Sequence, residues 1–184
     1  MEGGIYMSEE KSKSVLIIDD SPTNRAMLAK ILKDEVDVIE AENGEKGLHI
    51  LRSQIGKIGI VLLDLIMPGI SGFDVLTEMK KEHMTDYVPV IMISTADDPN
   101  NIEKAFDLGA LDFISRPYSE RIVRRRVLTT ISLFQKQTQI ANRIDRQYKA
   151  DEELTDSRTG LPYKKNFFNQ VDTQLKNPNL GPLY

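Results

Sequence analysis

Three aspartates stand at the ends of apolar runs that are typical of buried strands. Asp19 and Asp20 follow "SVLII" (14–18), and Asp64 ends "IGIVLLD" (58–64). In a parallel α/β sheet, ligands bind at the carboxyl ends of strands where the strand order reverses, so neighbouring strands would bring these carboxylates into one cleft. Such a cluster of like charges takes up a proton or a cation. Because no histidine or cysteine belongs to the cluster, its oxygen ligands favour Mg²⁺.

Helix capping, the commonest task of aspartate at such positions, does not account for this cluster. Ser21 before Pro22 already supplies the expected N-cap and first helical residue. Ser71 with Asp74 forms a capping box for a later helix, and Asp64 lies seven residues before that cap. A carboxylate beside Mg²⁺ can instead attack phosphorus and form an acyl phosphate, while the metal screens and orients the phosphoryl group. Asp64 is therefore the predicted phosphoacceptor.

Apolar runs and helix-period segments alternate five times and predict the elements that position these residues. This alternation is typical of a parallel α/β sheet with helices on both faces. The predicted strands are 14–18, 36–41, 58–64, 88–95 and 111–115, and the predicted helices begin near Pro22, Glu45, Gly72, Pro99 and Ser119.

Composition limits the possible functions. The 184 residues, 40% hydrophobic and 28% charged, fit one full domain with an extension. A net charge of −4 gives the whole chain no attraction to nucleic acid or to an anionic membrane. There is no cysteine for a disulfide, no apolar run long enough for a membrane span, and no signal peptide in residues 1–13, which read as a flexible tail. These features predict a cytoplasmic protein without nucleic-acid or membrane partners.

Residues 121–155 contain no helix breaker or strand signal and predict one long linker helix. Steps of three and four residues define an imperfect heptad seam, so a coiled-coil dimer and a solvated linker helix both remain open. The seam consists of Val127, Thr130, Phe134, Gln137, Ala141, Ile144, Tyr148 and Asp151.

Four segments in order resemble the receiver domain of two-component response regulators, and together they cover about residues 14–120. They are "LIIDDSP" (16–22), "LLDLIMPGISG" (62–72), "PVIMISTAD" (89–97) and "GALDFISRPYS" (109–119). The resemblance implies a flavodoxin-like (βα)₅ doubly wound parallel sheet of strand order 2-1-3-4-5, here extended by the long C-terminal helix. It also implies that a sensor histidine kinase, or a small donor such as acetyl phosphate, phosphorylates Asp64.

The same resemblance implies roles for further residues. Asp19, Asp20 and Asp64 would bind Mg²⁺ together with the backbone carbonyl of Ile66. Thr95 matches the hydroxyl that hydrogen-bonds the phosphate and takes part in switching. Phe113 matches the aromatic switch three residues before the basic position, although an aromatic residue in a strand also fits a plain core role.

Arg116 departs from the family pattern, which has Lys-Pro where this chain has Arg116-Pro117. Guanidinium is planar and forked, whereas the lysine ammonium is a compact point charge. Arg116 can still neutralise a phosphate, so a phosphorylatable receiver is the main interpretation. The alternative is a degenerate receiver that serves as a non-catalytic interaction module. Haloacid-dehalogenase-like phosphatases are disfavoured because they need Asp-x-Asp, not adjacent aspartates, after the first strand.

The segment "DSRTGLPYKKNFF" (156–168) resembles the opening of a diguanylate cyclase (GGDEF) domain, although a generic turn is the alternative. Residues 156–184 lack the Gly-Gly-Asp/Glu-Glu-Phe signature, so they are expected to be a truncated start of that output domain. The chain therefore contains no complete enzyme beyond self-catalysed aspartyl phosphorylation and dephosphorylation. Phosphorylation is expected to control the downstream cyclase through a homodimer formed by the receiver face, the long helix, or both.

Overall fold

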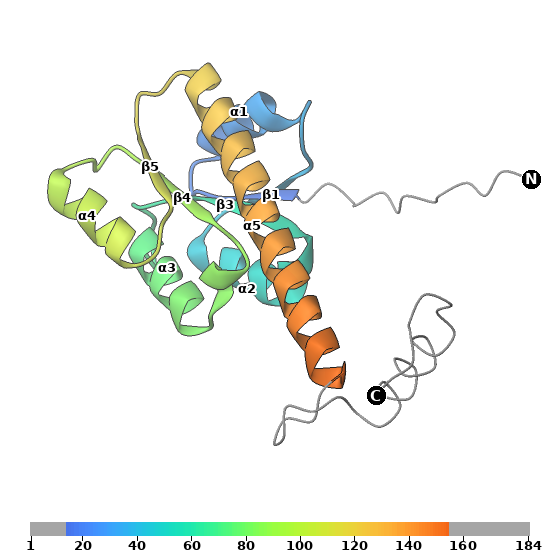
Figure 1. The fold of residues 1–184 in the computed structure, drawn as a ribbon. Coiled ribbons are helices and arrows are strands. Elements are labelled where there is room, and N and C mark those ends of the chain that lie inside the picture. Colours follow the sequence, from blue (N-terminus) through green and yellow to red (C-terminus); the bar gives the residue numbers. More distant parts are fainter. Residues whose placement is uncertain (1–13, 155–184) are drawn as a thin grey trace, which may run out of the picture. The chain divides into compact units, whose positions relative to one another are not determined.

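Strands and helices alternate throughout residues 14–154, which the computed structural model describes together with the side chains of 14–141 and 143 (Figure 1). The strands are β1 (Ser14–Ile18), β2 (Val38–Ala41), β3 (Ile58–Asp64), β4 (Val90–Ser94) and β5 (Asp112–Ser115). The α-helices are α1 (Pro22–Leu32), α2 (Gly44–Gln54), α3 (Gly72–Lys81), α4 (Pro99–Asp107) and α5 (Glu120–Leu154), and short 3₁₀ turns, η1 and η2, cover Ile55–Lys57 and Met84–Asp86. The predicted tail (1–13) and output segment (156–184) lie outside the described residues.

The five strands form one parallel sheet in the order β2-β1-β3-β4-β5, which confirms the predicted flavodoxin-like order. β1 and β3 are adjacent in its centre, and Ile18 at the end of β1 pairs with Leu63 near the end of β3. The residues that follow these two positions therefore emerge side by side at the carboxyl edge of the sheet.

Each face of the sheet is covered by its own helices and its own apolar layer (Figure 1). Strand side chains alternate between the two faces, and all seven residues of β3 are buried, as expected for a strand covered on both sides. The layer under α1 and α5 includes Val15, Ile17, Leu28, Ile31, Ile60, Leu62, Val123 and Val127. The layer under α2, α3 and α4 includes Leu16, Ile18, Leu48, Val61, Leu63, Leu76, Met79 and Phe113.

Two strands begin two residues later than the sequence predicts. The N–H of Val36 donates to the carbonyl of Leu32, 3.1 Å away, and so closes the turn after α1 instead of joining the sheet. The N–H of Val88 likewise donates to Met84 at 2.9 Å. Hydrogen bonds to the preceding turn thus override the apolar pattern at both starts.

The first part of α5 belongs to the core of the receiver unit. Val123 and Val127 are fully buried and Ile131 is 8% exposed, a spacing of four residues that keeps one helix face against the sheet. The chain divides into two compact units, one ending at Phe134 and the other beginning at Gln135. Val127, the first residue of the predicted heptad seam, thus packs in the core of its own domain and is not exposed to a partner helix. Among the described residues, no helix has the length and apolarity needed to cross a bilayer.

The predicted capping box at the start of α3 is present. Ser71 Oγ accepts a hydrogen bond from the Asp74 N–H at 3.3 Å, and Asp74 Oδ2 accepts one from the Ser71 N–H at 2.8 Å. Hydrogen bonds from the hydroxyl and then the N–H of Ser71 lower the pKa of Asp74. This contribution to stability is present at neutral pH and is lost as pH falls through the lowered pKa.

Replacing Ser71 with alanine is expected to lower the free energy of unfolding by about 1 kcal/mol at pH 7, because the cap is lost. The difference in the free energy of unfolding between the variant and wild type should become smaller in acid, where Asp74 becomes protonated. Urea unfolding across pH measures both effects. Ser53→Ala is the control, because within the described part of the chain the Ser53 hydroxyl donates only to carbonyls of its own helix. An equal loss in both variants would contradict a specific capping effect.

Candidate functional site

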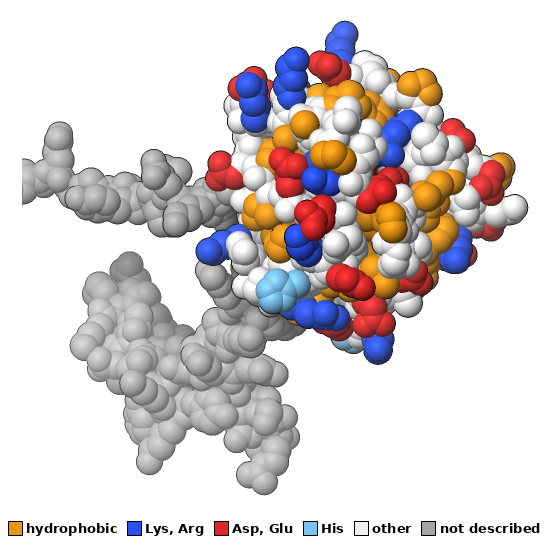
Figure 2. Space-filling view, turned by 180° about the vertical axis from the view of Figure 1, so that it is seen from behind, with side chains coloured by type: hydrophobic (Ala, Val, Ile, Leu, Met, Phe, Trp, Pro, Cys, Tyr) orange, Lys and Arg blue, Asp and Glu red, His pale blue; other side chains and the backbone are white. Residues whose placement is uncertain are grey.

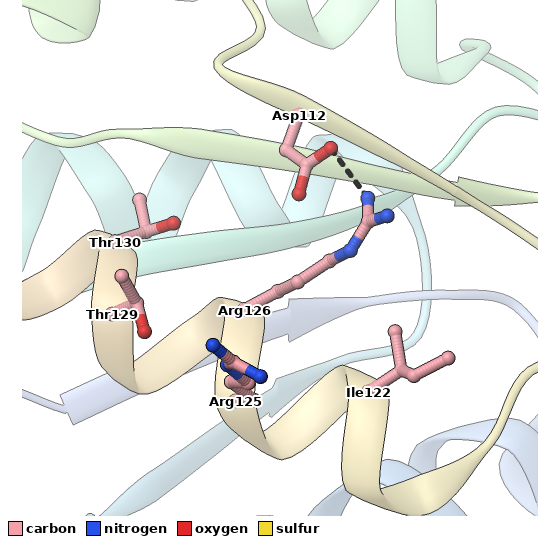
Figure 3. A pocket seen from close by; sticks show the side chains of 6 residues that line it. All are labelled: Asp112, Ile122, Arg125, Arg126, Thr129 and Thr130. Atoms are coloured by element: carbon pink, nitrogen blue, oxygen red, sulfur yellow. Dashed lines mark hydrogen bonds and ion pairs between the residues drawn. The ribbon is translucent and has the colours of Figure 1, made fainter.

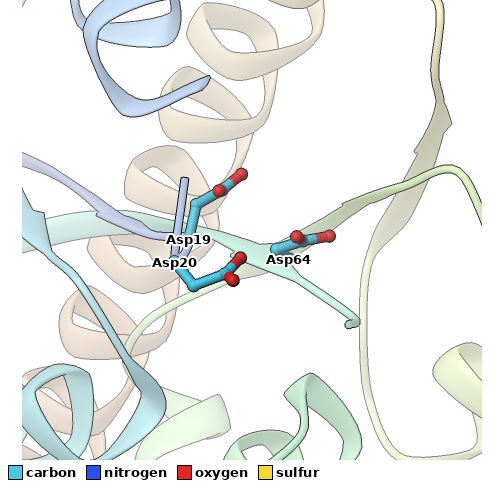
Figure 4. A group of neighbouring side chains, drawn as sticks. All are labelled: Asp19, Asp20 and Asp64. Carbon is cyan, nitrogen blue, oxygen red and sulfur yellow. The ribbon is translucent and has the colours of Figure 1, made fainter. Parts of the chain in front are cut away.

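Three carboxylates meet at the carboxyl edge of the sheet, where β1 and β3 end side by side (Figure 4). Asp19 and Asp20 follow β1, and Asp64 is the last residue of β3. One oxygen of each carboxylate lies within 4.8 Å of the others. Asp19 and Asp64 are buried, at 1% and 6% exposure, whereas Asp20 is exposed. The structure thus brings together the three aspartates that the sequence grouped.

Arg116 adds a positive charge to this cluster from the end of β5. Its N–H donates to the carbonyl of Ser94 at 2.9 Å, which extends the β4–β5 pairing by one residue. One terminal guanidinium nitrogen lies 2.5 Å from Asp19 Oδ2, and the other lies 3.3 Å from Asp64 Oδ1. The side chain is only 14% exposed, so solvent screens these ion pairs weakly. The following Arg116-Pro117 peptide bond is cis.

The environment of Asp64 disfavours its charged form. Burial is the largest cause and raises the pKa of Asp64; Arg116 opposes this effect, whereas the charge of Asp19 adds to it. The net result is a raised pKa. A carboxylate in this position gains stability from any additional cation that binds beside it.

Asp19 is held in place by its own helix. Its Oδ1 accepts hydrogen bonds from the Ser21 N–H at 2.8 Å and from the Asn24 side-chain amide at 3.2 Å. Asp20 has no side-chain hydrogen bond to any described residue, so its carboxylate is available to a ligand. The donor set around the cluster consists of oxygens only, which fits a hard cation such as Mg²⁺.

Arg25 is a site residue that the sequence analysis missed. Its guanidinium donates to the backbone carbonyls of Asp19 and Asp20, at 2.8 and 3.2 Å, and also pairs with Glu40 of β2 at 3.2 Å. The side chain is 14% exposed. It fixes the backbone that carries both aspartates. A possible signal was its position near the N-terminal end of α1, where the helix dipole disfavours a positive charge.

Gly72, also missed, fixes the position of Asp64. Its N–H donates to the carbonyl of Leu65 at 2.9 Å. A Cβ at Gly72 would lie 2.8 Å from the Leu65 Cα and would meet the backbone carbonyl oxygen of Asp64 even more closely. The start of α3 can therefore pack directly against the end of β3 only because this residue has no side chain.

Three other predicted residues make no hydrogen bond with the cluster in the described part of the chain. Thr95 follows β4, the strand next to β3, and is exposed. Phe113 lies in β5 and is 8% exposed, within the apolar layer under α2, α3 and α4. Ile66 follows Asp64 by two residues, and its side chain is 58% exposed.

A second surface feature is a groove of about 410 Å³ between β5 and α5 (Figure 3). Its lining consists of Asp112, Ile122, Arg125, Arg126, Thr129 and Thr130. Arg126 reaches across from α5 and pairs with Asp112 at 2.7 Å. Arg125 is exposed and has no partner among the described residues. Three exposed apolar side chains lie on α4, before β5 and on α5, namely Phe106, Leu111 and Ile122.

Comparison with known proteins identifies the family. The family model for the response regulator receiver domain matches residues 15–128. The chain belongs to the response regulator receiver family. Within that family, receiver domains are phosphorylated by histidine kinases.

Relatives of this receiver fall into several kinds of regulator. It is 33% identical over 123 residues to the "Probable cyclic di-GMP phosphodiesterase" of Vibrio cholerae, covering 67% of this chain but only 27% of the relative. It is also 33% identical over 114 residues to Protein PilH of Pseudomonas aeruginosa, covering 61% of this chain and 93% of PilH.

Solved structures agree with the fold. The "signal receiver domain of putative Luxo repressor protein" from Vibrio parahaemolyticus matches with a TM-score of 0.66 at 22% identity, covering 70% of this chain and 97% of that one. A "probable two-component system response regulator/GGDEF domain protein" matches with a TM-score of 0.63 at 25% identity, covering 68% of this chain and 51% of that one.

Proposed function

We propose that this receiver is controlled by Mg²⁺-dependent phosphorylation of Asp64 by a sensor histidine kinase. The observation that carries the proposal is the cluster of Asp19, Asp20 and Asp64 with Arg116 at the carboxyl edge of the sheet. Asp19, Asp20 and Asp64, with the backbone carbonyl of Ile66, would hold Mg²⁺, which supplies charge screening for the incoming phosphoryl group.

The chemistry is a phosphoryl transfer to a carboxylate. An oxygen of ionised Asp64 attacks phosphorus and forms an acyl phosphate, while the bond from phosphorus to the donor breaks and the donor keeps the electron pair. The donor is the phosphohistidine of the kinase or, in its absence, acetyl phosphate. Arg116 then neutralises charge on the phosphoryl oxygens, and the Thr95 hydroxyl donates to one of them. Phe113, which lies in β5 three residues before Arg116, would change its side-chain rotamer when Asp64 is phosphorylated.

The output that we propose is cyclic di-GMP metabolism. The names of two relatives support this: the Vibrio cholerae protein above and the "Cyclic di-GMP phosphodiesterase" of Thermotoga maritima, which is 30% identical over 115 residues. Residues 156–184 would begin a GGDEF-type domain, and the part of the predicted helical linker (121–155) that follows Phe134 would join it to the receiver unit. The receiver–GGDEF structure above favours a cyclase, whereas the names of both relatives are those of phosphodiesterases.

Dimerisation is the proposed link between phosphorylation and output. The groove between β5 and α5, which the exposed Ile122 lines, supports an interface on this face. Of the four arginines at the start of α5, Arg124 donates to the carbonyl of Ile31 and Arg126 pairs with Asp112. Arg121 and Arg125 remain for an acidic partner surface. Figure 2 shows the opposite side of the molecule from Figure 1, and there the side chains of both charge signs are interspersed, whereas a nucleic-acid interface has clustered basic residues.

Intact-protein mass spectra after incubation with acetyl phosphate and Mg²⁺ test this function. We expect a gain of one phosphoryl group, about 80 Da, that depends on Mg²⁺ and maps to Asp64. Size-exclusion chromatography of the same samples should show earlier elution if phosphorylation drives dimerisation. No adduct, under conditions that modify another receiver, would favour the degenerate receiver that acts as an interaction module.

A further inference from the structure

Arg116 uses its two terminal guanidinium nitrogens on two different acids. One pairs with Asp19 at 2.5 Å and the other with Asp64 at 3.3 Å. These two acids are the buried members of the cluster, with side-chain exposures of 2% and 6%. A guanidinium keeps its proton at any physiological pH, so Arg116 is a permanent cation inside the cleft.

The oxygens that Arg116 occupies belong to the cluster that would receive a metal. Asp19 has both oxygens in use, since Ser21 and Asn24 donate to Oδ1 and Arg116 pairs with Oδ2. Asp64 Oδ1 accepts a hydrogen bond from Arg116. Of the three acids, Asp20 alone has a carboxylate that makes no hydrogen bond or ion pair with a described residue. A divalent cation that binds both buried acids must therefore share them with the guanidinium or displace it.

The strongest interactions of the guanidinium among the described residues are those with the two acids, and the Tyr118 hydroxyl interacts with it more weakly. The Nε of Arg116 is buried and makes no hydrogen bond with any described residue. A buried donor without a hydrogen bond costs free energy, so Arg116 is held between Asp19 and Asp64 less strongly than a fully hydrogen-bonded guanidinium would be. The two acids provide the ion pairs that keep Arg116 in the cleft, and a competing cation would release it.

We propose that Arg116 is a built-in counter-cation that competes with Mg²⁺ for Asp19 and Asp64 and thereby sets the affinity of the cleft for the metal. This inference rests on the proposed function, because it takes Mg²⁺ as the metal of the site. The forked guanidinium can contact both acids at once, which the compact lysine ammonium does less well. Arg116 is in this respect a residue that positions the acids and tunes their metal affinity.

Calorimetric titration of the full 184-residue chain with Mg²⁺ tests the proposal. Arg116→Gln should bind Mg²⁺ about 10-fold more tightly than wild type, because one competing positive charge is gone. Arg116→Lys should lie between the two, since the charge stays but the fork is lost. Arg126→Gln, which breaks the ion pair with Asp112 on α5, is the matched control and should bind as wild type does.

Thermal unfolding in EDTA and in saturating Mg²⁺ separates competition from a plain structural role. Arg116→Gln should unfold at a lower temperature than wild type in EDTA and should gain more from Mg²⁺. A purely structural residue would lower both temperatures equally. If Arg116→Gln does not fold, Arg116→Lys still shows the direction of the change in affinity.

If the Arg116 variants bind Mg²⁺ as tightly as wild type or less tightly, Arg116 does not compete with the metal. The proposed phosphorylation of Asp64 would be unaffected by that result. Absence of Mg²⁺ binding in every variant, together with no adduct from acetyl phosphate, would overturn the proposed function itself. The two failures are therefore distinguishable.

Discussion

Replacing Asp64 with asparagine is expected to abolish the acetyl phosphate adduct, because an amide oxygen is too weak a nucleophile to attack phosphorus. The geometry of the cleft should persist, since asparagine has nearly the same shape and its Oδ1 can still accept from Arg116. The measurement is the intact mass of the variant after incubation with acetyl phosphate and Mg²⁺. Asp34→Asn, at an exposed turn after α1, is the control and should be modified as wild type is. A persistent adduct on Asp64→Asn would place the phosphoacceptor elsewhere.

The same substitution is expected to stabilise the fold without Mg²⁺ by about 1 kcal/mol at pH 7, the size of a typical stabilising change. Burial raises the pKa of Asp64, so the folded state bears a penalty whenever this carboxylate is ionised. The penalty is complete above the raised pKa and disappears below the unfolded value of about 4. The stability of Asp64→Asn relative to wild type should therefore grow as pH rises. Urea unfolding in EDTA at several pH values measures this, and a less stable variant at pH 7 would contradict it.

Gly72→Ala is expected to reduce the free energy of unfolding by about 3 kcal/mol, at the upper end of ordinary overpacking. The new methyl group would meet the backbone of Asp64 and Leu65, which cannot turn aside as a flexible side chain can. Because the end of β3 must shift, phosphorylation of Asp64 should also slow by about 100-fold. Urea unfolding and the initial rate of adduct formation measure the two effects.

Gly56→Ala is the matched control for this prediction. A Cβ at Gly56 meets no atom within 4 Å, and the residue does not have a positive φ. Its stability and its phosphorylation rate should stay close to those of wild type. If Gly72→Ala behaved like Gly56→Ala, the close approach of α3 to β3 would have no role in positioning Asp64.

The strands themselves could be predicted because they depend on short-range patterns, whereas their order, and with it the grouping of the acids, followed from the resemblance to receiver domains. Apolar runs mark the strands, and a parallel sheet places their polar ends at one edge, so Asp19, Asp20 and Asp64 meet once the first and third strands are neighbours. The long helix was also predicted, from the absence of any breaker.

Contacts between distant segments could not be predicted in the same way. Arg25 and Gly72 act on backbone atoms of other elements, and nothing in their neighbouring residues indicates those partners. Arg116 was expected to face a phosphate, but its double pairing with Asp19 and Asp64 depends on distances across the four strands from β1 to β5. The starts of β2 and β4 were misplaced because Val36 and Val88 bond to the preceding turns.

The shallow burial of α4 gives the domain an uneven resistance to local opening. Ala105 is the one residue of α4 that is fully enclosed, whereas the central strand β3 is buried along its whole length. Opening free energies follow such differences, so the amide hydrogens of α4 should exchange with solvent long before those of β1 and β3. The carboxylates therefore lie on the part of the fold that opens last, whereas α4 can open locally before the strands that carry them.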